Sequence, residues 1–258
     1  AQPDGLSEPS VLILDEARAG RIVDALARID RLVEADSRDD LRLEILELAL
    51  ARAPDQADAA ENAIKDRFSR RLAQALRAGA RGDMAIARSI DEWARGARDG
   101  QTAPFDDRDT ARRESWDYVL RGAIAAKTLD GFRAALAARP PFTTAADAES
   151  ASRILRVLMR EGRADWIRAL GPALKLPPDE TVSVDEDIGP MRSLPPDQLV
   201  AVARAAEATG TVRGTITDTA IEMLVARGAV DEAREAFISL GRIDELNRVS
   251  FDQERIGI

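Results

Sequence analysis

The residues whose types and spacing best fit a chemical role lie between Asp106 and Glu114. Asp106, Thr110 and Glu114 are four residues apart, so a helix would place them near one face. Asp107 would add a second carboxylate beside the first. Carboxylate and hydroxyl oxygens are ligands that magnesium accepts, and magnesium commonly holds substrate phosphates. The spacing is therefore compatible with magnesium-dependent chemistry on a diphosphate.

This stretch is similar to the Asn/Asp-Asp-x-x-Ser/Thr-x-x-x-Glu motif of terpene synthases, which are all-helical enzymes. The catalytic residues that the resemblance implies are Asp106, Asp107, Thr110 and Glu114. Residues 39–44 (Asp-Asp-Leu-Arg-Leu-Glu) loosely resemble the second, aspartate-rich motif of the same family. However, Arg108 replaces the apolar third residue of the motif, and a carbocation cavity needs more aromatic residues than the 4% found here. Aspartates also favour helix starts for capping reasons alone, so we keep this enzyme as the alternative reading.

The composition removes most other catalytic templates. The chain has no histidine, which excludes an imidazole base, a serine or cysteine relay through histidine, and imidazole metal ligands. It has no cysteine, which excludes a thiolate nucleophile, a disulfide and a thiolate metal site. We therefore predict that the protein is not an enzyme and that it uses no cofactor and no metal.

The charge balance limits the partners. Lys plus Arg is 37 and Asp plus Glu is 46, giving a net charge of -9 that repels nucleic acid and anionic lipid. No run approaches the roughly 18 apolar residues that cross a bilayer, so the chain is not expected to span a membrane. The start at Ala1-Gln2 resembles a mature chain after signal-peptide cleavage. This favours an exported, periplasmic bacterial protein, with a cytoplasmic location as the alternative.

Apolar residues recur at helical spacing along nearly the whole chain. One stripe is Ile22, Leu26, Ile29 and Val33, and others run through Phe68 and Trp116. Residues 41–50 are apolar on more than one face, which predicts a central helix buried between neighbours. About twelve helices of ordinary length fit the chain. Strand signals are nearly absent, so the predicted fold class is all-α.

Capping signals divide the helices. We expect helices to start near Ser37, Asp55 and Thr110. We expect them to end at glycines, which adopt a left-handed conformation without steric cost: Gly20, Gly79, Gly162, Gly210, Gly228 and Gly241. Residues 177–196 carry several prolines and an acidic cluster, which no continuous helix can cross. The predicted domains are a helical repeat region at 1–176, an acidic loop or linker at 177–196, and C-terminal hairpins at 197–258.

A short pattern recurs at the predicted turns: a helix end, a glycine, a few residues, an acidic residue and an alanine-rich helix. It is fullest over Gly228 to Phe237 (Gly-Ala-Val-Asp-Glu-Ala-Arg-Glu-Ala-Phe) and partial near Gly20 and Gly162. The full stretch resembles the turn between helices of tetratricopeptide and pentatricopeptide-like repeats. The resemblance implies a right-handed array of antiparallel helical hairpins, an α-solenoid, which binds another protein or a peptide on its extended surface.

The predicted function is therefore a non-enzymatic scaffold for protein interactions. Candidate partner-binding residues are Trp93, Trp116, Trp166, Arg153, Arg156 and Arg160. The tryptophans lie on apolar stripes and are expected in the core, whereas the arginines are expected on solvated faces. A tryptophan that stays exposed beside arginines would mark a docking site, because tryptophan and arginine dominate the binding energy of protein interfaces.

Overall fold

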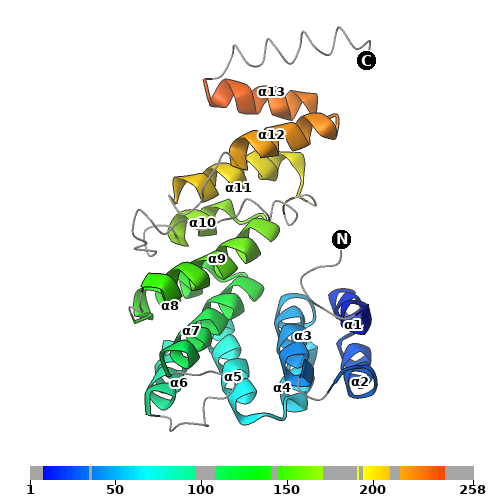
Figure 1. The fold of residues 1–258 in the computed structure, drawn as a ribbon, viewed down its shortest axis with the longest axis vertical. Coiled ribbons are helices and arrows are strands. Elements are labelled where there is room, and N and C mark those ends of the chain that lie inside the picture. The colour runs from blue at the N-terminus through cyan, green and yellow to red at the C-terminus, as the bar shows by residue number, and fades with distance from the viewer. Residues whose placement is uncertain are drawn as a thin grey trace. The chain divides into compact units, whose positions relative to one another are not determined.

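The computed structural model describes residues 8–34, 37–96, 108–140, 144–170, 191, 194–209 and 216–241 (Figure 1). Within these ranges the protein is all-α, with thirteen α-helices, one short 3-10 helix and no strand. The predicted fold class is confirmed at this level. None of the helices described is long and apolar enough to cross a membrane.

The chain divides into two compact units, residues 1–146 and 147–258. This contact-based division falls inside the ninth helix. The predicted partition into 1–176, 177–196 and 197–258 stays a prediction about domains, because residues 171–190 lie outside the described ranges.

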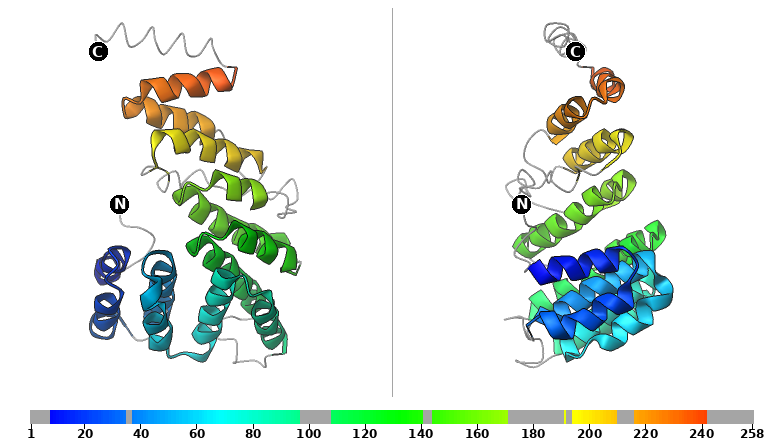
Figure 2. Two further views of the ribbon diagram at one scale, coloured as in Figure 1. Left: turned by 180° about the vertical axis from the view of Figure 1, so that it is seen from behind. Right: turned by 90° about the vertical axis from the view of Figure 1, so that its right-hand side faces the viewer.

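The first unit holds eight helices, which Figure 2 shows from two further sides. They are α1 (Glu8–Arg18), α2 (Ile22–Leu32), α3 (Arg38–Arg52), α4 (Ala57–Ala63), α5 (Arg67–Arg81), α6 (Met84–Gly96), α7 (Arg108–Ala125) and α8 (Leu129–Ala138), with the 3-10 helix at Pro54–Gln56. Odd-numbered helices contact one another in series, α1 with α3, α3 with α5 and α5 with α7. Even-numbered helices also meet, α2 with α4 and α6 with α8.

Helix α3 is central in this unit, as its apolar sequence predicts. It contacts α1, α2, α4, α5 and α7. Leu43, Ile45 and Leu46 are fully buried, so more than one face of the helix is covered. Burial of each such side chain contributes roughly 1.5–3 kcal/mol to folding.

The second unit contains five helices: α9 (Thr144–Arg160), α10 (Ala164–Leu170), α11 (Pro196–Ala208), α12 (Ile216–Ala226) and α13 (Val230–Ser239). From α10 onward each helix contacts the next, and α11 also contacts α13. The apolar positions Leu199, Val202 and Ala206 of α11 are all fully buried, which matches their helical spacing.

The recurring glycine pattern forms one kind of turn. Gly20, Gly162 and Gly228 have positive φ angles of 81°, 70° and 72°, a conformation open to glycine at little cost. After each glycine the next N–H donates to a carbonyl five residues back, as from Ala229 to Leu224 at 2.9 Å. Lys127 (φ 56°) makes the same turn between α7 and α8 without a glycine.

Two of the predicted helix ends differ from the structure or lie beyond it. Gly79 does not end a helix: α5 continues to Arg81, and the left-handed residue that closes it is Gly82, whose φ is 69°. Gly210 lies outside the described residues. The sequence prediction missed Gly82 because Gly79 stands three residues earlier in the same apolar pattern.

The predicted helix start at Ser37 is confirmed, whereas the one at Thr110 lies two residues too late. Ser37 precedes α3 but makes no capping hydrogen bond with its side chain. Thr110 lies inside α7, which begins at Arg108. The cap that the prediction missed is Asp66, whose Oδ2 accepts from the N–H of Ser69 at 2.7 Å at the start of α5. Asp39 of α3 in turn accepts from the N–H of Asp66 at 2.5 Å, which ties α5 to α3.

Helices α5 and α7 pack with their backbones in close approach. A Cβ atom added to Gly79 would lie 1.8 Å from the carbonyl oxygen of Val119. A Cβ added to Gly122 would lie 1.9 Å from the carbonyl oxygen of Leu76. Real Cβ atoms do not approach backbone this closely, so both glycines are required for this crossing.

We expect Gly79→Ala to lower the free energy of unfolding by about 3 kcal/mol, because the obstacle is backbone and cannot rotate away. Gly96→Ala is the matched control, since a Cβ there meets no atom within 4 Å. Thermal unfolding followed by circular dichroism measures both changes. Equal melting temperatures for the two variants would contradict the close crossing.

Candidate functional site

Trp93 of α6 is a half-buried tryptophan held between arginines of α5. The guanidinium carbons of Arg71 and Arg67 lie 5.3 Å and 6.0 Å from its ring centre. The Phe68 ring lies 6.0 Å from the Trp93 ring and anchors it to the core. Gln74 accepts a 3.0 Å hydrogen bond from Arg71, which holds that guanidinium in place. Cation–π contacts of this kind contribute about 0.5–1 kcal/mol at exposed sites.

These residues belong to a stripe along α5. Positions 67, 71, 74, 78 and 81 are three or four residues apart, so they share one face of the helix. Ile86 and Trp93 are two turns apart on the adjacent α6. We call the face formed by Arg67, Arg71, Gln74, Arg77, Ala78, Arg81, Ile86 and Trp93 the α5–α6 surface.

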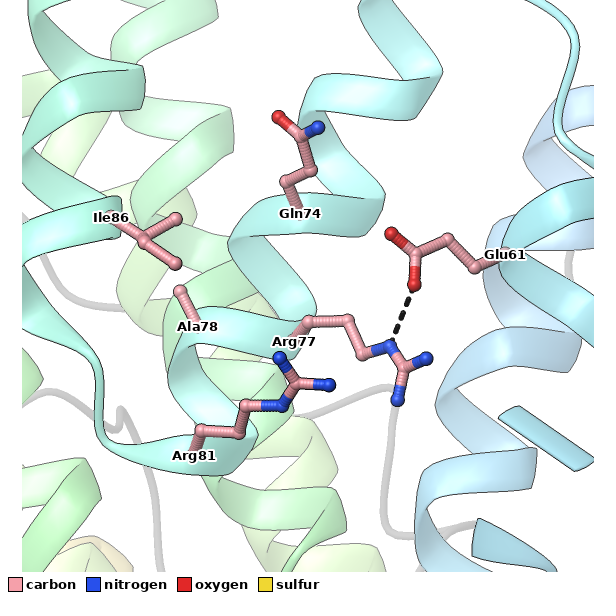
Figure 3. Close-up of a pocket in the computed structure, with 6 residues that line it drawn as sticks. All are labelled: Glu61, Gln74, Arg77, Ala78, Arg81 and Ile86. Carbon is pink, nitrogen blue, oxygen red and sulfur yellow. Dashed lines mark hydrogen bonds and ion pairs between the residues drawn. The ribbon is translucent and has the colours of Figure 1, made fainter. Parts of the chain in front are cut away.

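A cavity opens at the C-terminal end of this surface (Figure 3). Its volume is about 280 Å³, and it is lined by Glu61, Gln74, Arg77, Ala78, Arg81 and Ile86. Glu61 reaches into it from α4, Arg77 and Arg81 extend from α5, and Ile86 lies on α6 beside Ala78. Pockets for drug-sized ligands begin at about 300 Å³, so the cavity suits one or two side chains better than a cofactor.

The two arginines in the cavity differ in their partners. Nε of Arg77 donates to Glu61 at 2.7 Å, and its Nη2 pairs with Asp58. Arg81 makes no hydrogen bond or ion pair with any residue that the structure describes. Burial and the positive charge of Arg81 both lower the pKa of Arg77. Burial raises the pKa of Glu61, with Arg81 acting in the opposite direction.

Trp116, by contrast, is a core residue. Its side chain is 1% exposed, and its Nε1 donates to Asp91 at 3.3 Å. The buried Asp91 carboxylate also accepts from Arg112 at 2.9 Å and from Arg95 at 2.9 Å. Because Arg112 and Trp116 lie on α7, these hydrogen bonds link α6 to α7. This network therefore positions helices and presents no tryptophan to a partner.

A half-buried ion pair joins α3 to α7. Nε of Arg121 donates to Glu47 at 2.9 Å, and Arg121 lies 4.6 Å from the centre of the Tyr118 ring. Burial, and then repulsion from Asp39, Glu114 and Asp66, raises the pKa of Asp40 on the same helix α3. Glu114 of α7 is therefore close enough to Asp40 of α3 for their charges to interact.

The described residues nevertheless do not fit a magnesium ion. Thr110 and Glu114 lie on α7, whereas Asp106 and Asp107 fall outside the described residues. Among the residues that the structure does describe, no three acidic or other ligating side chains are grouped so that they could hold a metal.

The remaining candidates lie in the second unit. Trp166 of α10 is 3% exposed and has Arg163 at 5.8 Å from its ring centre. Arg153, Arg156 and Arg160 are exposed on α9, as expected for a solvated face. Arg160 also lies 4.0 Å from Glu161. Of the three tryptophans, only Trp93 keeps part of its ring available to a partner.

The sequence prediction identified Trp93 but missed the residues around it. Arg67, Arg71, Arg77 and Arg81 were not singled out, although their spacing was visible in the sequence. Helix α5 carries five arginines and no acidic residue in a chain whose net charge is -9. That local excess was the available signal, and only the packing of α6 shows that it surrounds a tryptophan.

Comparison with protein-family models, with curated proteins and with solved structures finds no match to this chain.

We expect the single tyrosine, Tyr118, to ionise only near pH 12, because burial is the main cause that raises its pKa to about 12. Arg121 opposes this shift and nearby carboxylates add to it. Unfolded tyrosine ionises near pH 10. The contribution of neutral, buried Tyr118 to the free energy of unfolding is therefore fully present below about pH 10. It is lost as the pH rises toward 12, because the unfolded state ionises first. Tyrosinate absorbance during an alkaline titration measures the midpoint, with the same titration in urea as the control. A native midpoint at the urea value would contradict the buried position.

Proposed function

We propose that this protein is a non-enzymatic scaffold that binds a peptide segment of another protein on the α5–α6 surface. The observation that supports it is Trp93, which stays half-buried between Arg67 and Arg71 while the other two tryptophans are in the core. Partly exposed tryptophans and arginines supply most of the binding energy in protein interfaces. A rigid tryptophan held by flanking side chains also loses little conformational entropy on binding.

We also propose that the helices of the first unit are stacked hairpins, α1 with α2, α3 with α4, α5 with α6 and α7 with α8. The series of contacts among odd-numbered helices and the repeated left-handed turn support this arrangement. In stacked hairpins one layer of helices lines an extended surface on which a peptide can lie. The α5–α6 surface would then be one section of that larger surface.

The test is affinity capture with crosslinking from the source organism, using the protein and three variants. We expect one captured protein to be reduced about tenfold by Trp93→Ala and by Arg71→Glu, because each removes a central contact. Arg88→Glu is the matched control: it makes the same charge change on α6, roughly 200° around the helix from Ile86.

Circular dichroism first establishes that each variant is folded. Arg71→Glu keeps the test decisive if Trp93→Ala proves unstable, since Arg71 lies at the surface of α5. Captured proteins that are the same in amount for all variants would overturn the proposal.

The alternative function is an all-α, magnesium-dependent enzyme that acts on a diphosphate through Asp106, Asp107, Thr110 and Glu114. On the scaffold proposal, we expect calorimetric titration of pyrophosphate in the presence of magnesium chloride to give only the heat of dilution. Binding heat that disappears in Glu114→Gln would instead favour the enzyme. Pyrophosphate without magnesium is the control for simple anion binding to exposed arginines.

A further inference from the structure

The cavity at the end of the α5–α6 surface has the chemistry of a carboxylate site. We propose that Arg81 binds a carboxylate of an acidic peptide partner there, while Ile86 contacts an adjacent aliphatic group. This inference rests on the proposed function and specifies the chemistry of its partner.

The two arginines of the cavity differ in whether they are already paired with a carboxylate. Arg77 is already paired with Glu61 and Asp58, whereas Arg81 has no hydrogen bond or ion pair within the described residues. Two neighbouring guanidinium groups repel each other, and this repulsion contributes to the lowered pKa of Arg77. A carboxylate that enters beside Arg81 relieves the repulsion and pairs the second cation.

The volume of the cavity and the residues that line it suit an acidic side chain. About 280 Å³ accommodates an aspartate or glutamate side chain with part of its neighbour. Ile86 is 40% exposed, an unusual position for an isoleucine, and it lies on the apolar side of the cavity next to Ala78. Besides the ion pair of Arg77 with Glu61, the cavity therefore offers a further cation and an apolar wall, a combination that suits an acidic residue beside an aliphatic residue.

The distance from Arg81 to the arginines beside Trp93 sets the expected spacing of the binding residues in the peptide. Arg71 and Arg81 are ten positions apart on α5, which corresponds to about 15 Å along the helix. An extended peptide covers this distance in about five residues. We therefore expect the acidic residue to stand about four to six positions from the residue that contacts Trp93.

The whole surrounding helix is also complementary to an acidic peptide. Helix α5 has five arginines and no acidic side chain, whereas the chain as a whole has a net charge of -9. A negatively charged peptide is thus attracted to this face and repelled by the average surface. Arg67 and Arg71 extend the positive potential from the cavity to Trp93.

The test is selection of random peptides displayed on phage against the full chain, followed by anisotropy measurements with the enriched peptide in synthetic, fluorescent form. We expect enriched peptides to share an aspartate or glutamate at the stated distance from an apolar or aromatic residue. Their affinity should fall about tenfold or more with Arg81→Glu and change less than about twofold with Arg88→Glu. A peptide with lysine in place of the acidic residue should bind Arg81→Glu better than it binds the unchanged protein.

A chain terminus could supply the carboxylate instead of a side chain. The synthetic peptide is therefore measured with a free and with an amidated C-terminus. Affinity that depends only on amidation assigns the site to a terminal carboxylate, and affinity that depends only on the acidic side chain assigns it to that residue. Either result supports the carboxylate site.

The outcomes also separate this inference from the proposed function. Peptides that require Trp93 but show no acidic preference, and that bind Arg81→Glu unchanged, would overturn the carboxylate site and leave the scaffold standing. Peptides that are insensitive to both Trp93→Ala and Arg71→Glu, or no enrichment at all, would overturn both.

Discussion

The backbone contact between α5 and α7 is the constraint on which the first unit depends. Gly79 and Gly122 each face a carbonyl oxygen of the other helix at a distance that leaves no room for a Cβ atom. Helix α7 also contacts α3, α6 and α8, so the crossing of α5 and α7 is joined directly to three further helices. With one face of α5 pressed against α7, its arginine-rich face has to lie elsewhere. That face meets α4 and α6, and it becomes the surface that we propose as the binding site.

Two groups of buried or half-buried charges in this unit are paired, and the pairing determines which charges remain for a partner. Asp91 joins Arg95, Arg112 and Trp116, while Glu47 joins Arg121. A buried ion without partners would cost several kcal/mol, so these groups are committed to holding α3, α6 and α7 together. The exposed arginines of α5 do not hold helices together in this way. The same distinction explains why a tryptophan that hydrogen-bonds to Asp91 lies in the core, whereas one that stacks against arginines remains partly at the surface.

Much of the fold could be predicted because it depends on local chemistry. Helical spacing and glycine conformation act within a few residues, so the all-α class, the central α3 and the turns at Gly20, Gly162 and Gly228 follow from the sequence. The predictions were wrong where contacts between residues far apart in the sequence determine the structure. Gly79 is a residue type that often ends helices, but here it allows two helices to cross closely. Thr110 is a residue type that often caps helices, but it lies within α7.

The sequence by itself determined that the protein is helical, that it has no imidazole or thiol chemistry, and where most of its helices turn. Those properties depend on residue types and on short-range periodicity. Only the tertiary structure decided which of three similar tryptophans stays accessible, and that Arg81 shares a cavity with an arginine already paired with Glu61. Burial and pairing depend on which helix faces meet, and the faces that meet are set by contacts between residues far apart in the chain.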